Sequence, residues 1–197
     1  MAPLSYAAGL PREWVVGGLA GLTAVAMVVE TARARSERAR HHFTRYTGVL
    51  LREHEHHRWA GATWMLVAYL FAAAAYPRPF AIAAMWAVGV GDASAAVVGR
   101  WWSERRRQRA ARPVAGGGRG PAVPARPGAK TYAGTLACFV AALIGARWVA
   151  ALPLIAALLT ALLAALAERP RAPLDDNLRI VLAVGAVALA WRLITLG

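Results

Sequence analysis

Cysteine, lysine and acidic residues are scarce in this sequence. Its 197 residues include 23 basic and 10 acidic side chains, and a single lysine, Lys130. Cys138 is the only cysteine, which excludes an intrachain disulfide and a cysteine-based zinc site. The chain also lacks a Gly-rich P-loop and the protein-kinase signature, so any phosphate site must be of another kind.

Charge is almost absent from six long blocks. Apolar residues make up 58% of the chain, above the roughly 45–50% of soluble domains, and a transmembrane helix needs about 20 of them in succession. The blocks are Trp14–Val29, Trp59–Tyr76, Phe80–Gly99, Thr131–Ala146, Trp148–Ala167 and Ile180–Trp191. They predict an all-α, polytopic integral membrane protein with about six transmembrane helices, in which residues 1–197 form a single membrane domain.

The basic residues alternate between loops. Seven arginines separate the first two blocks, and eight arginines with Lys130 separate the third from the fourth. The positive-inside rule places these loops in the cytoplasm and both termini outside. The membrane is then expected to be the plasma (inner) membrane. Because the charge follows this topology, it does not indicate a nucleic-acid partner.

Two polar segments face the cytoplasm in this scheme. Residues 32–58 form the first. Residues 101–129 hold Gly116-Gly117-Gly118 and four prolines, and predict a flexible loop. We expect its arginines to lie against the headgroups of membrane lipids.

Asp92 is the one charge inside the third block. A carboxylate within a membrane span is a candidate functional group, although a buried pair with an arginine is the alternative. Gly91, Ala95 and Gly99 recur every four residues beside it. Small residues at this spacing predict a face on which another helix packs closely.

Lys130 precedes Thr131-Tyr132-Ala133-Gly134-Thr135 at the start of the fourth block. Its compact charge suits phosphate, and a helix start exposes N–H groups to an anion. The alternative is a lysine that anchors to headgroups beside an N-cap threonine.

A third group consists of Glu168 and Asp175-Asp176-Asn177 before the last block. One of these residues could simply cap the helix, but several oxygen donors together also suit Mg²⁺. A fourth group, His54-Glu55-His56-His57, supplies a candidate general base in His54 or Glu55. A solvated histidine run is the alternative there.

The topology places all four groups at the cytoplasmic ends of spans. Carboxylates for a divalent metal and a lysine for phosphate, gathered at a bilayer surface, predict phosphoryl or nucleotidyl transfer.

These motifs resemble the dolichol kinase and phytol kinase family, membrane enzymes that use CTP to phosphorylate lipid alcohols. The resemblance rests on Gly91-Asp92-x-x-Ala95-x-x-x-Gly99-Arg100, Lys130-Thr131-x-x-Gly134-Thr135, Glu168 and Asp176-Asn177-Leu178. It implies CTP and a lipid alcohol as substrates, with Mg²⁺ as cofactor. It also implies roles for the matching residues: Asp92, Glu168, Asp175 and Asp176 for the metal, and Gly91, Lys130, Thr131, Gly134, Thr135 and Asn177 for the nucleotide.

Two alternatives remain open. The first two motifs are also similar to those of phosphatidate cytidylyltransferases, although the C-terminal signature of those enzymes is missing. The kinase family usually has glutamate where this chain has Ala133, which favours a catalytically inactive membrane scaffold as the third reading.

Overall fold

The computed structural model describes residues 2–38, 41, 59–110, 130–169 and 174–196, and all regular secondary structure in these ranges is helical. Four helical stretches are long and apolar enough to cross a membrane: Arg12–Arg35, Arg78–Arg109, Tyr132–Val149 and Asp176–Thr195. The apolar helices Gly61–Ala75 and Leu154–Glu168 are shorter. The all-α prediction is therefore confirmed, and the fold has helices suited to a bilayer.

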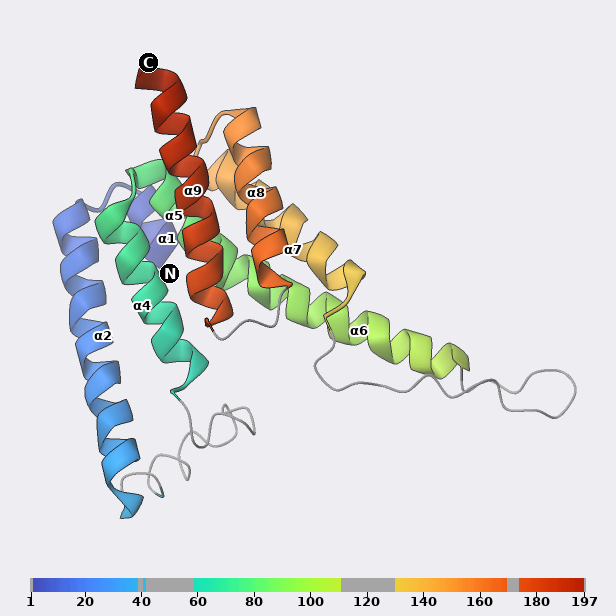
Figure 1. The fold of residues 1–197 in the computed structure, drawn as a ribbon, viewed down its shortest axis with the longest axis horizontal. Helices are drawn as coiled ribbons and strands as arrows, with labels where there is room; N and C mark the ends of the chain where they lie inside the picture. The colour runs from blue at the N-terminus through green and yellow to red at the C-terminus, as the bar shows by residue number, and fades with distance from the viewer. Residues whose placement is uncertain (1, 39–40, 42–58, 111–129, 170–173, 197) are drawn as a thin grey trace, which may run out of the picture.

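The helices form a bundle in which successive long helices alternate in direction (Figure 1). In chain order they are α1 (Ala2–Ala7), α2 (Arg12–Arg35), α4 (Gly61–Ala75), α5 (Arg78–Trp86), the π-helical segment η3 (Ala87–Gly91), α6 (Asp92–Ala110), α7 (Tyr132–Ile144), the π-helical segment η4 (Gly145–Val149), α8 (Leu154–Glu168) and α9 (Asp176–Leu196). This alternation brings the C-terminal ends of α2 and α8 to the same side as the N-terminal ends of α4 and α9.

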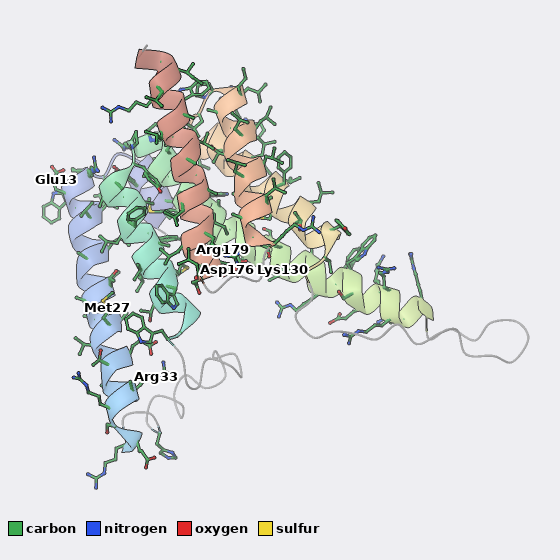
Figure 2. The ribbon with its side chains drawn as sticks, in the orientation of Figure 1. Glu13, Met27, Arg33, Lys130, Asp176 and Arg179 are labelled. Atoms are coloured by element: carbon green, nitrogen blue, oxygen red, sulfur yellow. The ribbon has the colours of Figure 1, made fainter. Side chains whose placement is uncertain are left out.

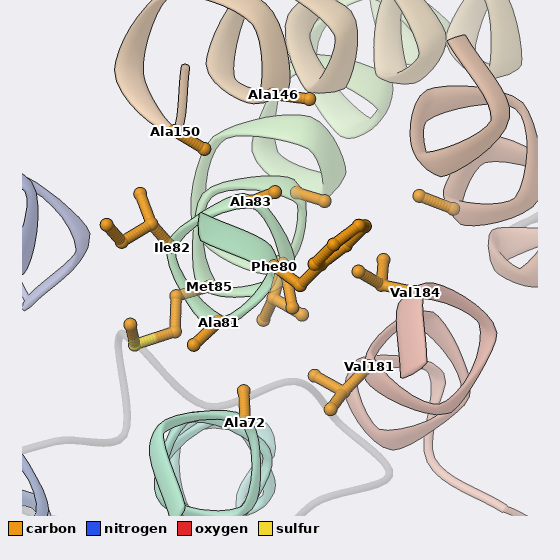
Figure 3. Packing of buried hydrophobic residues seen from close by; sticks show 14 of the residues in the cluster. Ala72, Phe80, Ala81, Ile82, Ala83, Met85, Ala146, Ala150, Val181 and Val184 are labelled. Atoms are coloured by element: carbon orange, nitrogen blue, oxygen red, sulfur yellow. The ribbon is translucent and has the colours of Figure 1, made fainter. Parts of the chain in front are cut away.

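Helix α5 lies at the centre of the core. Its residues from Phe80 to Met85 are all buried. They face Ala72 of α4, Ala146 and Ala150 beyond α7, and Val181 of α9 (Figure 3). Because so many of the core side chains are alanine, the helix backbones approach closely, as in other membrane bundles.

At three positions where helices cross, an aromatic ring packs against a glycine. Trp86 occupies the space beside Gly145 and donates its indole N–H to the Ala141 carbonyl at 3.1 Å. Tyr76 lies against Gly185 and donates to the Val181 carbonyl at 3.0 Å. Tyr69 fills the same kind of space beside Gly89. A methyl group at any of these glycines would collide with the ring.

Two arginines donate hydrogen bonds to carbonyl groups at helix C-termini, on the side of the bundle where α2 and α5 begin. The Arg12 guanidinium donates to the carbonyls of Ala73, at 3.0 Å, and Ala74 at the end of α4. Arg78 donates to the Tyr6 carbonyl at 2.6 Å, at the end of α1. Cations at helix C-termini satisfy carbonyls that have no partner within the helix.

The structure corrects the sequence-based boundaries in three places. The predicted loop at 101–129 is wrong at its start, because α6 continues unbroken to Ala110. Arginine is a good helix former, and the Ser103 hydroxyl donates to the Gly99 carbonyl at 2.8 Å within the helix. The break between the fourth and fifth apolar helices falls at 150–153, because η4 carries α7 on through Arg147 and Trp148 to Val149 and α8 begins at Leu154, directly after Pro153. Helix α1 was not predicted, yet Tyr6 on it is almost fully buried.

Candidate functional site

Lys130 brings two carboxylates from different helices together. Its ammonium nitrogen lies 2.7 Å from Glu168 Oε1, at the end of α8, and 3.4 Å from Asp176 Oδ2, at the start of α9. It also donates to the backbone carbonyl of Glu168. Figure 2 shows Lys130 and Asp176 side by side at the lower ends of α8 and α9. Groups from the start of α7, the end of α8 and the start of α9 therefore lie together, as the topology predicted.

The surroundings of the three groups differ in exposure to solvent. The Glu168 side chain is only 7% exposed, whereas those of Lys130 and Asp176 are each 28% exposed. Nearby, the Arg169 guanidinium lies over the Tyr132 ring at 4.5 Å from its centroid, a second cation contact between the end of α8 and the start of α7. The cluster is thus buried on the side of Glu168 and open on the side of Lys130 and Asp176.

Asp175 and Asn177 build the start of α9. The Asn177 backbone N–H donates to Asp175 Oδ1 at 3.0 Å, so Asp175 is the residue of this group that caps the helix. Burial raises the pKa of the Asp175 carboxyl above its usual value, and the hydrogen bond from Asn177 opposes this effect. The Asn177 side chain donates to the Gly61 carbonyl at 3.4 Å, which ties the start of α9 to the start of α4. In this structure both residues act on the helix framework.

The predicted small-residue face of α6 is confirmed, and its partner is α7. A Cβ at Gly99 would lie 3.1 Å from Thr131 Oγ1, and one at Gly91 would lie 3.3 Å from Cys138 Sγ. From the opposite side, a Cβ at Gly134 would lie 2.8 Å from the Ala95 carbonyl oxygen. Glycines on both helices therefore let α7 lie directly on the segment that begins at Asp92.

Asp92 begins α6 immediately after η3 and is half-buried. Its carboxylate, the Glu168 carboxylate and the Lys130 ammonium are all near enough to act electrostatically on the buried Cys138 thiol. Because the neighbouring Gly91 packs against Cys138, Asp92 lies where α6 begins to pack on α7. A π-helical turn directly before a half-buried acid is notable because such turns often occur at functional sites.

The helix-start N–H groups differ from the prediction. The Gly134 N–H donates to the Thr131 hydroxyl at 3.0 Å, and the Thr135 N–H donates to the Thr131 carbonyl at 3.0 Å. Thr131 is thus the N-cap of α7. Because both amides already donate within α7, an anion could reach them only by displacing these bonds. Lys130 is left as the phosphate-binding candidate of this motif.

A second polar cluster, which the motifs did not reveal, lies at the end of α2. Glu30 is 4% exposed and forms a 2.7 Å ion pair with Arg33. Its other oxygen accepts from the Ala60 N–H at 2.9 Å and from the Thr63 hydroxyl at 3.2 Å. Glu30 therefore acts as a distant cap for α4. The sequence signal was an isolated acid at the end of an apolar block, three residues before an arginine.

Two predicted features, the group around His54 and a cluster of metal ligands, are not seen among the residues that the structure describes. His54 and Glu55 lie outside the described ranges. Among the residues that are described, no three His, Cys, Asp or Glu side chains converge closely enough to hold a metal ion. The carboxylates of Glu168 and Asp176 do converge on one point, at Lys130.

No protein-family model, curated protein or solved structure matches the chain.

Proposed function

We propose that this protein is a CTP-dependent kinase that phosphorylates a lipid alcohol at the cytoplasmic face of the plasma membrane. In this proposal α4 and α8 join the four longer helices as spans, the cluster around Lys130 faces the cytoplasm, and both termini lie outside. The acceptor hydroxyl reaches the interface while its apolar tail stays in the bilayer.

The observation that supports the proposal is the pairing of Lys130 with Glu168 and Asp176. An ammonium group that has one carboxylate at 2.7 Å and a second at 3.4 Å can exchange partners when a charged ligand arrives. The lysine would then bind phosphate oxygens, and the carboxylates would be released towards a cation. Asp92, which acts electrostatically on the same Cys138 thiol as Lys130 and Glu168, is the third acid of the proposed site.

The acidic groups fit a magnesium–nucleotide complex better than a resident metal. Mg²⁺ usually takes one or two carboxylates and completes its shell with water and substrate phosphates. Glu168 and Asp176 supply two such oxygen donors, with Asp92 and Asp175 nearby in the fold. When bound with CTP, Mg²⁺ would neutralise the charge that develops on the phosphates.

The transfer itself is a displacement at phosphorus. The oxygen of the lipid hydroxyl forms a bond to the γ-phosphorus of CTP, the bond between that phosphorus and the β–γ bridging oxygen breaks, and CDP leaves. The hydroxyl proton passes to a base, for which His54 or Glu55 is our candidate. Lys130 stabilises the negative charge on the phosphate oxygens, and Asn177 helps to position the nucleotide.

Incubation of the purified protein with radiolabelled CTP and a panel of lipid alcohols tests the proposal. A kinase releases CDP together with a lipid phosphate. Pyrophosphate release with phosphatidate as the substrate would instead identify a cytidylyltransferase. Tight binding of Mg²⁺–CTP with no product from any lipid would favour an inactive scaffold, the reading that Ala133 suggests.

A further inference from the structure

The C-terminal part of α6 projects from the bundle as a basic arm, which we define as Arg100–Arg109. Figure 1 shows this part of the helix extending away from the other helices. Every side chain in the arm is exposed except that of Ser103, which is partly buried and bonded to Gly99. The arm carries five arginines against the single carboxylate of Glu104. In the described part of the chain nothing neutralises this charge.

Residue types change in layers along α6. Its first turns, from Ala93 to Val98, are apolar or small. After Gly99 and Arg100 come Trp101 and Trp102, with 47% and 45% of their surface exposed, and then the other four arginines of the arm. Apolar residues, then tryptophan, then a positive charge is the order expected for a helix that leaves the hydrocarbon core through the headgroup region.

The packing of α6 fixes where this transition occurs. Gly99, one residue before the arm, lies against Thr131 at the start of α7, next to Lys130. The arm therefore begins at the level of the Lys130 cluster and lies at that end of the bundle. Arg105 lies over the Trp101 ring at 4.2 Å from its centroid, so one guanidinium is held at the tryptophan layer. This contact is a cation–π interaction, which orders both side chains.

We propose that the arm binds the headgroups of anionic phospholipids in the membrane that holds the protein. The guanidinium groups match phosphate oxygens in charge and in hydrogen-bonding geometry, and basic residues beside a membrane span are attracted to an anionic surface. The arm thereby gathers negatively charged lipid beside the Lys130 cluster. This inference does not depend on the kinase proposal, and either can fail without the other.

A fluorescent probe on the arm tests the inference. The full-length protein carries Cys138→Ala to remove the native thiol and Gln108→Cys for labelling. It is placed in two sets of nanodiscs that contain the same mixture of phosphatidylglycerol and phosphatidylcholine in equal amounts. In one set only the phosphatidylglycerol is brominated, and in the other only the phosphatidylcholine. We expect quenching by phosphatidylglycerol to exceed quenching by phosphatidylcholine roughly twofold or more. High salt should reduce this difference, because it screens exposed charges.

Two matched controls make the result specific. In the first, Arg105, Arg106 and Arg107 are all changed to Gln with the probe kept at position 108, and the preference for phosphatidylglycerol should disappear. In the second, the probe is moved by Leu193→Cys to the exposed far end of α9, where both lipids should quench equally. Equal quenching by both lipids at position 108 would overturn the inference, as would a preference that survives the arginine changes. Protection of the probe by an added oligonucleotide, with no lipid preference, would also overturn it and identify a nucleic-acid surface.

Discussion

Lys130 and Glu168 are joined twice, through the 2.7 Å ion pair and through a bond from the ammonium group to the Glu168 backbone carbonyl. The ammonium group thus lies at the C-terminal end of α8, where the helix dipole and the carboxylate both favour a cation. The start of α7 is thereby held against the end of α8, and Asp176 adds α9 to the same point.

The pairing of Lys130 with Glu168 should appear in a double-mutant cycle. Lys130→Met and Glu168→Gln should each lower the free energy of unfolding by about 1–2 kcal/mol, because each leaves a poorly hydrated polar partner. The loss of unfolding free energy in the double variant should be smaller than the sum of the losses in the two single variants, and the difference gives a coupling energy of about 1 kcal/mol. SDS titration in mixed micelles measures these values. Fully additive losses would show that the two groups do not interact.

Asp92 should be essential for activity and dispensable for folding. If the protein is the proposed kinase, Asp92→Asn should lower kcat for CTP-dependent phosphorylation by about 100-fold or more, because the proposal places this carboxylate at the metal–phosphate complex. Its unfolding midpoint should stay near that of the parent. Glu13→Gln, an exposed acid on α2, is the matched control and should keep full activity. An active Asp92→Asn variant would remove this residue from the site.

Gly134 should tolerate no side chain. In Gly134→Ala the new Cβ would lie 2.8 Å from the Ala95 carbonyl oxygen, so α6 and α7 must separate, at a cost of about 1–3 kcal/mol. Gly21→Ala is the control, since nothing lies within 4 Å of a Cβ there. That change should be neutral or stabilising by up to about 1 kcal/mol. Equal effects of the two changes on the free energy of unfolding would contradict the close packing.

Glu30 should matter for stability far more than Glu13, the other acid of α2. Glu30→Ala removes the partner of the buried Arg33 and the acceptor for the start of α4, and should destabilise the fold by about 3–5 kcal/mol. Glu13→Ala, on the exposed face of the same helix, should change the free energy of unfolding by less than about 0.5 kcal/mol. A small effect of Glu30→Ala would mean that this buried network is not maintained in solution.

Asp175 should make the stability of the protein depend on pH. Its folded-state pKa is raised above the usual value of 3.8 because of burial, so the folded protein holds the proton more tightly than the unfolded chain. The stabilising contribution is then complete below about pH 4 and is lost as the pH rises through the raised pKa. Asp175→Asn keeps the acceptor for Asn177 and removes the titration. Its unfolding midpoint should therefore rise relative to that of the parent between acidic and neutral pH, and a constant difference would refute this assignment.

The sequence by itself determined the helical blocks and their order. Long uncharged runs can satisfy their backbone in a bilayer only as helices, so Trp14–Val29 and Phe80–Gly99 predicted α2 and most of α5 to α6. The spacing of Gly91, Ala95 and Gly99 also predicted a packing face, because period and side-chain size are local properties. Thr131 and Asp175 were recognisable as candidate caps for the same reason.

Only the tertiary structure decided which helices those features meet. The sequence predicted that Lys130, Glu168 and Asp176 lie at the same end of the bundle, but it did not indicate that Lys130 pairs with both carboxylates. Nor did it indicate that α7 covers Gly91, or that Glu30 caps a helix that starts at Gly61. Ion pairs and distant caps depend on the positions of whole helices, and those positions are set by small contacts such as Trp86 on Gly145. The arginine-rich end of α6 was predicted to be a loop because its composition resembles that of a solvated loop. Its backbone instead continues a helix whose earlier turns pack against α7.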